Sequence, residues 1–587
     1  MAKHKKNKWD NWTEKDYQKE IEILRKKKTY GLVWEEDKTK EVFDYYINWD
    51  GEQTKESFGE EDNKFPVLKE VKSKSIDNED PKYNLMIEGD NYHSLATLSF
   101  THNKAIDVIY IDPPYNSGKD KEWKYNDNWI DKEDGYKHSK WLSFMSKRLK
   151  LVKNILKKGG IIFVSIDNHE FAQLKILMDD IFGEENLVEI FSWVKTSTPP
   201  ALSNKTRKTN EYILCYENGK TKEKYFAEEL SGGDQPLLNR GNNQKDLIFP
   251  KNKVFFKIED TELKKGEYDR VELKDDIKIE NGYSNKNFII NGEFKWTQLK
   301  LDKEIKKGTT FIIKSKNLSI RFLRENDESY KSPTNYIKEN IINPQINKKE
   351  FDVGTNETAS SELQQIFHKK IFDNPKPVSL IKYLINFNRS KNITILDFFA
   401  GSGTTGHAVM SLNKEDGGKR KFILCTNNED NNQTGLRIAS DICYPRIKKV
   451  IEGYANNKGE KIEGYKDNFK YFKTDFVDSA PTDQNKKKIV DKSTEMLCIK
   501  ENAFKLIKEN QGYKIFKNTD VHLGIIFDEE EISDFIKDAK EIDGKFHVYL
   551  FSLDNSIPEK EFKDMKGKVK LCAIPEAILH VYRRVFR

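Results

Sequence analysis

The chain of 587 residues contains no run of 18 apolar residues, and its basic start, MAKHKKNKWDNW, is not followed by the apolar core of a secretory signal. Its five cysteines are scattered, with no C-x-x-C pair to indicate zinc or redox chemistry, which fits a reducing cytoplasm. A G-x-x-x-x-G-K-[ST] phosphate loop is also missing, because Leu214 stands where the first glycine before Gly219 is needed. We therefore expect no membrane insertion, no secretion, no bound metal and no ATP-driven motor in this polypeptide.

The composition is that of a folded chain of several domains. Hydrophobic residues make up 36% and aromatic residues 12%, including 35 Phe and 25 Tyr, which argues against wholesale disorder. Lys and Arg number 102 against 96 Asp and Glu, so the formal net charge is +6. This mild positive balance permits a polyanionic partner without requiring one.

The first part of the chain has the pattern of a parallel α/β sheet. After a basic arm expected over residues 1–60, short apolar runs at 83–87 (YNLMI), 105–111 (AIDVIYI) and 161–166 (IIFVSI) indicate buried strands. A helix with apolar residues at helical spacing is expected between the last two runs, with a glycine stop at Gly159 and Gly160. Strands that alternate with helices predict a sheet covered on both faces.

The pattern is interrupted and then resumes. Residues 221–365 are rich in Lys, Asn and Gly with short β-like segments, which indicates an inserted domain between two parts of one sheet, 61–220 and 366–455. Residues 456–587 predict a further α/β domain that closes with a helix at 574–587 (IPEAILHVYRRVFR).

A glycine-rich turn lies between a predicted strand and a predicted helix in ITILDFFAGSGTTGHAV (393–409). Such a G-x-G-x-x-G turn lets the backbone approach a ligand at the start of the helix, although the glycines can also serve only close packing of helix on strand. The next strand ends in CTNNED, where Asn428, Glu429 and Asp430 are candidates to hold ribose hydroxyls. Together these segments predict a cofactor that contains adenosine, without saying which one.

The second unusual turn is IDVIYIDPPYNSG (106–118), where two prolines stop a buried strand. The alternative is a purely structural role, in which the Pro-Pro turn only ends a strand. A carboxylate beside a backbone carbonyl, however, can accept both hydrogens of an exocyclic amine, and an aromatic ring three residues later can stack on a base swung out of its duplex. With a methyl donor held by the glycine loop, this arrangement favours methyl transfer to a nucleobase amine.

These motifs closely resemble amino-group DNA methyltransferases in which D-P-P-Y precedes the glycine loop, especially the Mod subunits of Type III restriction-modification systems. The resemblance also covers NLMIEGDNYHSL, GGIIFVSIDNHE, FDNPKPVSLIKYL and the closing IPEAILHVYRRVF. It implies a circularly permuted, seven-stranded Rossmann-like sheet that uses S-adenosylmethionine, with the insertion serving as a target-recognition domain. It further implies double-stranded DNA as substrate, a Mod homodimer and a possible Res helicase-nuclease partner.

The resemblance also implies roles for individual residues. Asp112 and the carbonyl of Pro113, in the turn with Pro114, would bind the amine, and Tyr115 would stack on the base. The cofactor would be held by Asp90, Lys376, Pro377, Asp397, Phe398, Ala400, Gly401, Ser402, Gly403, Thr404 and Glu429. His407 is expected to be a packing residue.

Contacts to DNA are less specified. Candidates are Trp193 and Lys195 in FSWVKTSTPP, and Arg240, Lys295, Trp296, Lys314, Lys316 and Arg321 in the insertion. The alternatives are a core position for the tryptophan and a solvated surface for each basic side chain.

Adenine N6 is the favoured target, because Asp112 opens the motif in Mod-like surroundings. Cytosine N4 methylation uses the same amine chemistry and stays open. Two other classes are a nicotinamide-dependent oxidoreductase, which leaves D-P-P-Y and the insertion unexplained, and a subunit that only supplies DNA specificity, against which the intact D-P-P-Y argues.

Overall fold

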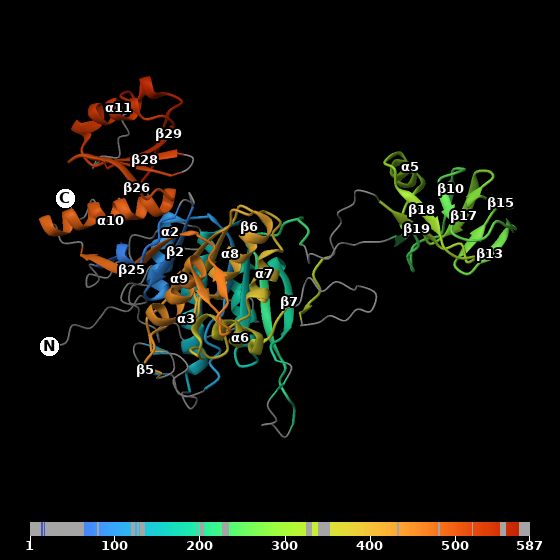
Figure 1. Cartoon of the computed structure of the whole chain (residues 1–587), viewed down its shortest axis with the longest axis horizontal. Coiled ribbons are helices and arrows are strands. Elements are labelled where there is room, and N and C mark those ends of the chain that lie inside the picture. The colour runs from blue at the N-terminus through green and yellow to red at the C-terminus, as the bar shows by residue number, and fades with distance from the viewer. Residues whose placement is uncertain are drawn as a thin grey trace. The chain divides into compact units, whose positions relative to one another are not determined.

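A computed structural model describes residues 13–15, 17, 64–78, 82–118, 124–125, 128–129, 135–196, 198–199, 205–225, 234–324, 332–337, 353–430, 434–478, 482–518, 521–551 and 559–574. They form two compact units (Figure 1): Met1–Glu223 with Thr334–Arg587, and Lys224–Pro333. Nearly all of the basic arm expected over 1–60, and the closing helix beyond residue 574, lie outside the described residues.

The larger unit is built around a ten-stranded sheet. Its order is β1 (Lys64–Glu70), β25 (Asn468–Asp478), β2 (Tyr83–Glu88), β22 (Lys421–Thr426), β21 (Thr394–Asp397), β3 (Ile106–Ile111), β6 (Leu156–Ile166), β8 (Asn210–Glu217), β7 (Leu187–Val194) and β20 (Tyr336–Ile337). From β25 to β20 all strands are parallel except β8, and β1 is antiparallel at the edge. The predicted α/β class and mainly parallel sheet are confirmed.

Helices cover both faces of this sheet. One face packs on α2 (Asn91–Thr101), α3 (Lys137–Ile155) and α4 (Phe171–Phe182) in a single apolar cluster that includes Ile423 and Cys425 of β22. Their neighbours Phe422 and Leu424 point to the other face, against α8 (Thr404–Asp416) and α9 (Tyr444–Glu452). This alternation is the period of a strand buried on both sides. Helices α6 (Asn356–Phe367) and α7 (Val378–Ile385) complete the second layer.

The expected glycine stop after α3 is wrong. The helix ends at Ile155, and Gly159 and Gly160 already lie inside β6. Leu156 pairs with Ile106 across the sheet, and the Asn218 side chain donates to the carbonyl of Leu156 at 2.8 Å, so pairing with the sheet overrides the continuing helical pattern.

The smaller unit carries its own apolar core, in which Phe249, Phe288 and Phe311 are fully buried. Its strands are β9 (Gln235–Pro236), β10 (Lys245–Phe249), β11 (Val254–Phe256), β12 (Glu262–Leu263), β13 (Gly266–Tyr268), β14 (Val271–Leu273), β15 (Ile277–Glu280), β16 (Tyr283–Ser284), β17 (Phe288–Gly292), β18 (Thr310–Ile313) and β19 (Ile320–Leu323), with one helix, α5 (Gln298–Lys306). This unit ends at Pro333, earlier than the boundary expected at 365. Helix α6 belongs to the larger unit, because the Asn356 amide donates to the carbonyl of Lys195.

The C-terminal part also begins later than residue 456, since β25 belongs to the large sheet. Helix α10 (Asp483–Glu501) packs between β1 and a second sheet of β26 (Lys505–Glu509), β27 (Tyr513–Lys517), β28 (Val521–Ile526), β29 (Lys545–Leu550) and β30 (Val569–Cys572), which also carries α11 (Ile532–Glu541) (Figure 1). Two short hairpins, β4 (Lys124–Tyr125) with β5 (Asn128–Trp129) and β23 (Gly453–Ala455) with β24 (Lys461–Glu463), complete the described elements. Among the helices of the described ranges, none has the length and apolar character to cross a membrane.

Candidate active site

The two motifs lie at the same edge of the large sheet. Strands β21 and β3 are parallel neighbours, with Leu396 opposite Ile109. Asp397 ends β21 and Asp112 directly follows β3, so both carboxylates stand at the carboxyl ends of adjacent strands. In open α/β sheets this edge is where ligands bind.

The D-P-P-Y turn is held by hydrogen bonds at each end. The Tyr115 hydroxyl lies 2.7 Å from Asp112 Oδ1, and Trp141 Nε1 donates to the carbonyl of Pro114 at 2.7 Å. The next residue, Asn116, has a φ of +56° and donates its side-chain amide to the buried Glu170. Burial raises the pKa of Glu170 to about 8. Asp112 and Tyr115 are therefore presented by a rigid turn.

Lys376 connects this turn with the glycine loop. Its ammonium Nζ lies 2.7 Å from Asp112 Oδ2 and 3.0 Å from the Tyr115 hydroxyl, while its own carbonyl accepts the Thr404 hydroxyl at 3.1 Å. The Lys376 side chain is 6% exposed and that of Asp112 is 28% exposed. The neighbouring Pro377 is the N-cap residue of α7. Lys376 was expected to contact the cofactor, and the structure directs its side chain to the acid of the D-P-P-Y motif.

A second carboxylate completes this cluster. Glu211, at the start of the antiparallel strand β8, lies 3.0 Å from the Tyr115 hydroxyl and 3.5 Å from Lys376 Nζ through Oε2, and 2.8 Å from Lys195 Nζ through Oε1. We call Asp112, Tyr115, Glu211, Lys376 and Lys195 the acid cluster.

Burial and charge act in opposite directions on the acid cluster. Burial raises the pKa of Asp112 despite the Lys376 ammonium. Burial alone would raise the pKa of Glu211 too, but Lys376 and Lys195 outweigh it and lower that pKa. Asp112 and Glu211 outweigh the effect of burial on Lys376 and keep its pKa above the ordinary value, so the ammonium stays charged.

The glycine loop uses its three glycines for different purposes. Gly401 and Gly403 have φ values of +49° and +79°, a backbone conformation that favours glycine. Gly406 has an ordinary helical conformation, but a Cβ there would lie 2.7 Å from Ile447 Cδ1. The packing alternative therefore holds for the third glycine, while the first two shape the turn itself.

Arg446 supports the loop from α9. Fully buried, it donates to the Thr404 hydroxyl at 2.8 Å and to the Ser402 hydroxyl at 3.1 Å, and burial lowers its pKa to about 10. His407 contacts the same guanidinium, and burial with that charge lowers its pKa to about 3. A neutral, half-buried His407 fits the packing role expected for it.

Asp397, Asp90 and Glu429 are the three acids predicted to contact the cofactor. Burial raises the pKa of Asp397 to about 7, although the Phe399 amide donates to it at 3.0 Å. Asp90 caps α2 through the Tyr92 amide and pairs with the buried Arg148 at 3.0 Å. Phe398 is buried in the core, and the Ala400 amide donates to the carbonyl of Cys425.

The third acid follows β22. Asn428 accepts a hydrogen bond from the Ser440 amide and Asp430 accepts one from the Gly435 amide, so both side chains serve the local loop. Glu429, between them, is half-buried and its carbonyl accepts the Ile438 amide.

A family model described as DNA methylase matches residues 106–436, more than half of the chain and both motifs. The protein belongs to the DNA methylase family. It is 30% identical over 435 residues to the Type III StyLTI Mod subunit of Salmonella typhimurium, covering 69% of this chain and 63% of that subunit. It is 33% identical over 400 residues to the Type II methyltransferase M.KpnI of Klebsiella pneumoniae, covering 64% of this chain and 89% of the relative. The chain thus spans less than two thirds of the StyLTI Mod subunit.

Among solved structures, the M1.HpyAVI–SAM complex matches 60% of this chain and 96% of its own at 12% identity, with a TM-score of 0.28. Such a score is too low to support an argument. The membership of the DNA methylase family confirms the resemblance drawn from the two motifs.

The residues predicted to contact DNA differ in burial and in their partners. Trp193 is fully buried, with Nε1 donating to the carbonyl of Gly354 at 3.2 Å, so it borders the acid cluster from the core. Lys314 and Arg321 both pair with Asp234, at 2.5 and 2.9 Å. Exposed Arg240 and Lys295 lie on neighbouring segments. Lys316 is exposed, whereas Trp296 packs in the core of the smaller unit.

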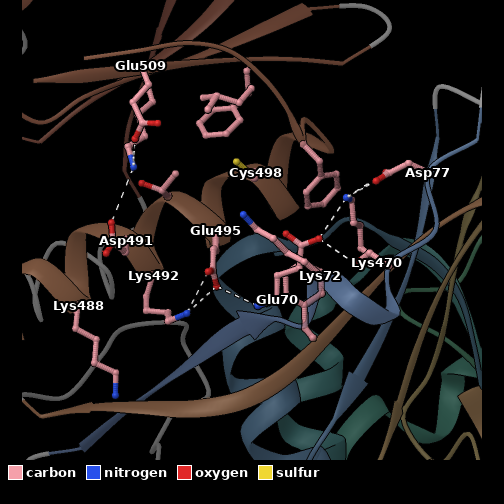
Figure 2. A pocket seen from close by; sticks show the side chains of 17 residues that line it. Glu70, Lys72, Asp77, Lys470, Lys488, Asp491, Lys492, Glu495, Cys498 and Glu509 are labelled. Atoms are coloured by element: carbon pink, nitrogen blue, oxygen red, sulfur yellow. Dashed lines mark hydrogen bonds and ion pairs between the residues drawn. The ribbon is translucent and has the colours of Figure 1, made fainter. Parts of the chain in front are cut away.

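A separate cavity of about 620 Å³ lies where β1, β25 and α10 meet the C-terminal sheet (Figure 2). Five lysines and five acids line it, and several of them pair with each other, as Lys470 does with Glu70 and Asp77 and Lys492 does with Glu495. Because its charges balance, the cavity favours no ligand of one sign, and none of the acid cluster lines it.

Sequence reasoning missed Glu211, Arg446 and Glu170. Glu211 had a weak signal, an acid directly before the run YILCY (212–216). Glu170 also had one, because SIDNHE follows a buried strand. Arg446 had none, since a basic residue on a helix is usually exposed.

Proposed function

We propose that this protein is an S-adenosylmethionine-dependent DNA methyltransferase that modifies the N6 amine of adenine in double-stranded DNA. The observation that carries the proposal is Lys376, whose side chain binds Asp112 while its carbonyl binds Thr404. One residue therefore joins the turn suited to an amine with the loop suited to a cofactor.

Asp112 and the carbonyl of Pro113 would accept the two hydrogens of the amine and leave its lone pair available as a nucleophile. The Tyr115 ring is held at its hydroxyl by Asp112 and Glu211, so its orientation is set before a base arrives. Stacking on a flipped base needs such a preset aromatic face. An aspartate at the first motif position and the identity with a Mod subunit favour adenine over cytosine.

The residues of the glycine loop suit the proposed cofactor. The amides at the start of α8 fit a carboxylate, and the acids Asp397, Asp90 and Glu429 fit an amino group, a purine amine and a ribose. When bound, S-adenosylmethionine supplies a methyl group on a positively charged sulfur, which keeps the C–S electron pair when the group leaves. Asp397 would hold the amino end, because its carboxylate already faces the loop.

The smaller unit would serve as the target-recognition domain, and the likeness to a Type III Mod subunit supports a modification role with a homodimer and a Res partner. Sedimentation of the DNA-bound protein at micromolar concentration tests the dimer, and a monomer there would remove that part of the proposal.

The decisive experiment combines purified protein, methyl-labelled S-adenosylmethionine and duplex DNA, followed by nucleoside analysis. We expect label in N6-methyladenine for the wild type and none for Asp112→Ala. Label in N4-methylcytosine would change the base assignment. Sequence-specific DNA binding without any transfer at saturating cofactor, or tight NAD binding without S-adenosylmethionine affinity, would refute the proposed activity.

A further inference from the structure

The Lys376 ammonium contacts Asp112, the residue proposed to bind the target amine. The ammonium lies 2.7 Å from Asp112 Oδ2 with 6% of the side chain exposed. An ammonium donates up to three hydrogen bonds and carries a full positive charge. Unopposed, it would compete with the amine for Asp112 and cancel the negative charge of that carboxylate.

Glu211 opposes this ammonium. Its Oε2 lies 3.5 Å from Lys376 Nζ and accepts from the Tyr115 hydroxyl, and its side chain is 6% exposed. With Lys195 included, the two carboxylates and two ammoniums of the acid cluster sum to zero, and without the Glu211 charge they would sum to +1. Lys195 pairs with the far oxygen, Oε1, and is 25% exposed, so water screens its charge more than that of Lys376.

We propose that Glu211 is a positioning residue, which holds Lys376 in place and offsets its charge so that Asp112 remains an effective acceptor for the target amine. This inference rests on the proposed methyl transfer. As the amine nitrogen takes up the methyl group it becomes positively charged, and it then loses one proton. Asp112 accepts this proton and, being 28% exposed, releases it to water. A site whose charges balance stabilises the positive nitrogen better than a site with a net charge of +1 does.

The test is single-turnover methyl transfer with enzyme in excess over duplex DNA at saturating S-adenosylmethionine. It compares the wild type, Glu211→Gln, Lys376→Met and the double variant. We expect Glu211→Gln to slow transfer by at least about tenfold with little change in cofactor affinity, because Lys376 is then uncompensated. We expect the double variant to be faster than Glu211→Gln alone, because the charge that Glu211 offsets is gone.

The pH dependence of the single-turnover rate separates this role from a purely structural one. Asp112 is faced by Lys376, Glu211, Tyr115, Tyr110 and Asp397. Removing the Glu211 charge should move the low-pH limb of the profile of rate against pH to lower pH. Removing the Lys376 charge should move this limb to higher pH. If Glu211→Gln does not fold, the shift to higher pH can still be measured in Lys376→Met. The matched control is Glu463→Gln on the exposed strand β24, which should change neither rate nor profile.

The outcomes distinguish two failures. A wild type that transfers no methyl group overturns the proposed function and this inference with it. An active wild type with an equally fast Glu211→Gln variant, or a double variant slower than Glu211→Gln, overturns the role of Glu211 alone. The role of Glu211 is also overturned if the low-pH limb of the rate profile moves in the same direction in both single variants.

Discussion

Replacement of Lys376 by methionine should destabilise the larger unit far more than the same replacement six residues later on the chain. At an effective dielectric constant of about 20, unit charges 2.7 and 3.5 Å apart attract by about 6 and about 5 kcal/mol. Desolvation of the ammonium offsets much of this attraction, and breaking a buried pair costs about 3–5 kcal/mol in practice. Because Asp112 is 28% exposed and Glu211 retains Lys195, we expect a loss at the lower end, about 3 kcal/mol.

Lys382 on α7 is the matched control. It pairs with Glu415, but the two side chains are 25% and 51% exposed, and exposed pairs contribute about 0–1 kcal/mol. The assay is urea unfolding of Lys376→Met and Lys382→Met beside the wild type, with midpoints compared at equal slope.

The pH dependence of this loss has a definite sign. Without Lys376 the pKa of Asp112, already raised, rises further in the folded state, and the lowered pKa of Glu211 loses one of its causes. A carboxyl whose folded pKa is raised loses its stabilising contribution as pH rises through that pKa. The deficit of Lys376→Met should therefore be larger at pH 8 than at pH 5. Equal losses for both lysines, or a deficit that shrinks with rising pH, would refute the reasoning.

Three further predictions concern other sites. Burial raises the pKa of Glu170 to about 8, so its contribution to the free energy of unfolding should fall as pH rises from about 4.5 to 8. In urea titrations at several pH values, Glu170→Gln should flatten this dependence of the free energy of unfolding on pH. An unchanged dependence contradicts the prediction. Gly403→Ala should cost more stability than Gly417→Ala, because both have positive φ but only Gly403 would place its Cβ 3.1 Å from Cys443 Sγ; calorimetry of the two variants decides. Arg240→Ala should weaken DNA binding and lower the slope of log affinity against log salt by about 1. Lys314→Ala should change both less, because Lys314 is already paired with Asp234. Equal effects of the two variants in fluorescence anisotropy would exclude Arg240 as a preferred phosphate contact.

Local patterns in the chain were sufficient for the strands and the two turns. The apolar runs at β3, β6 and β21 are buried strands because hydrophobic periodicity acts over a few residues. Prolines at 113 and 114, and glycines at 401 and 403, restrict or free the backbone at the positions they occupy. The order of these segments then places both turns at the carboxyl edge of one parallel sheet.

Tertiary structure alone decided the partners of these turns. Glu211 reaches Tyr115 only because β8 runs antiparallel, which puts its second residue at the edge where the neighbouring strands end. Lys376 lies 264 positions from Asp112 in the chain, and no local pattern relates them. The sequence by itself determined where the chain turns and which residues are apolar, because those properties depend on near neighbours. Which charges meet depended on strand order and direction, because buried charges are paired by whichever segments the sheet brings together.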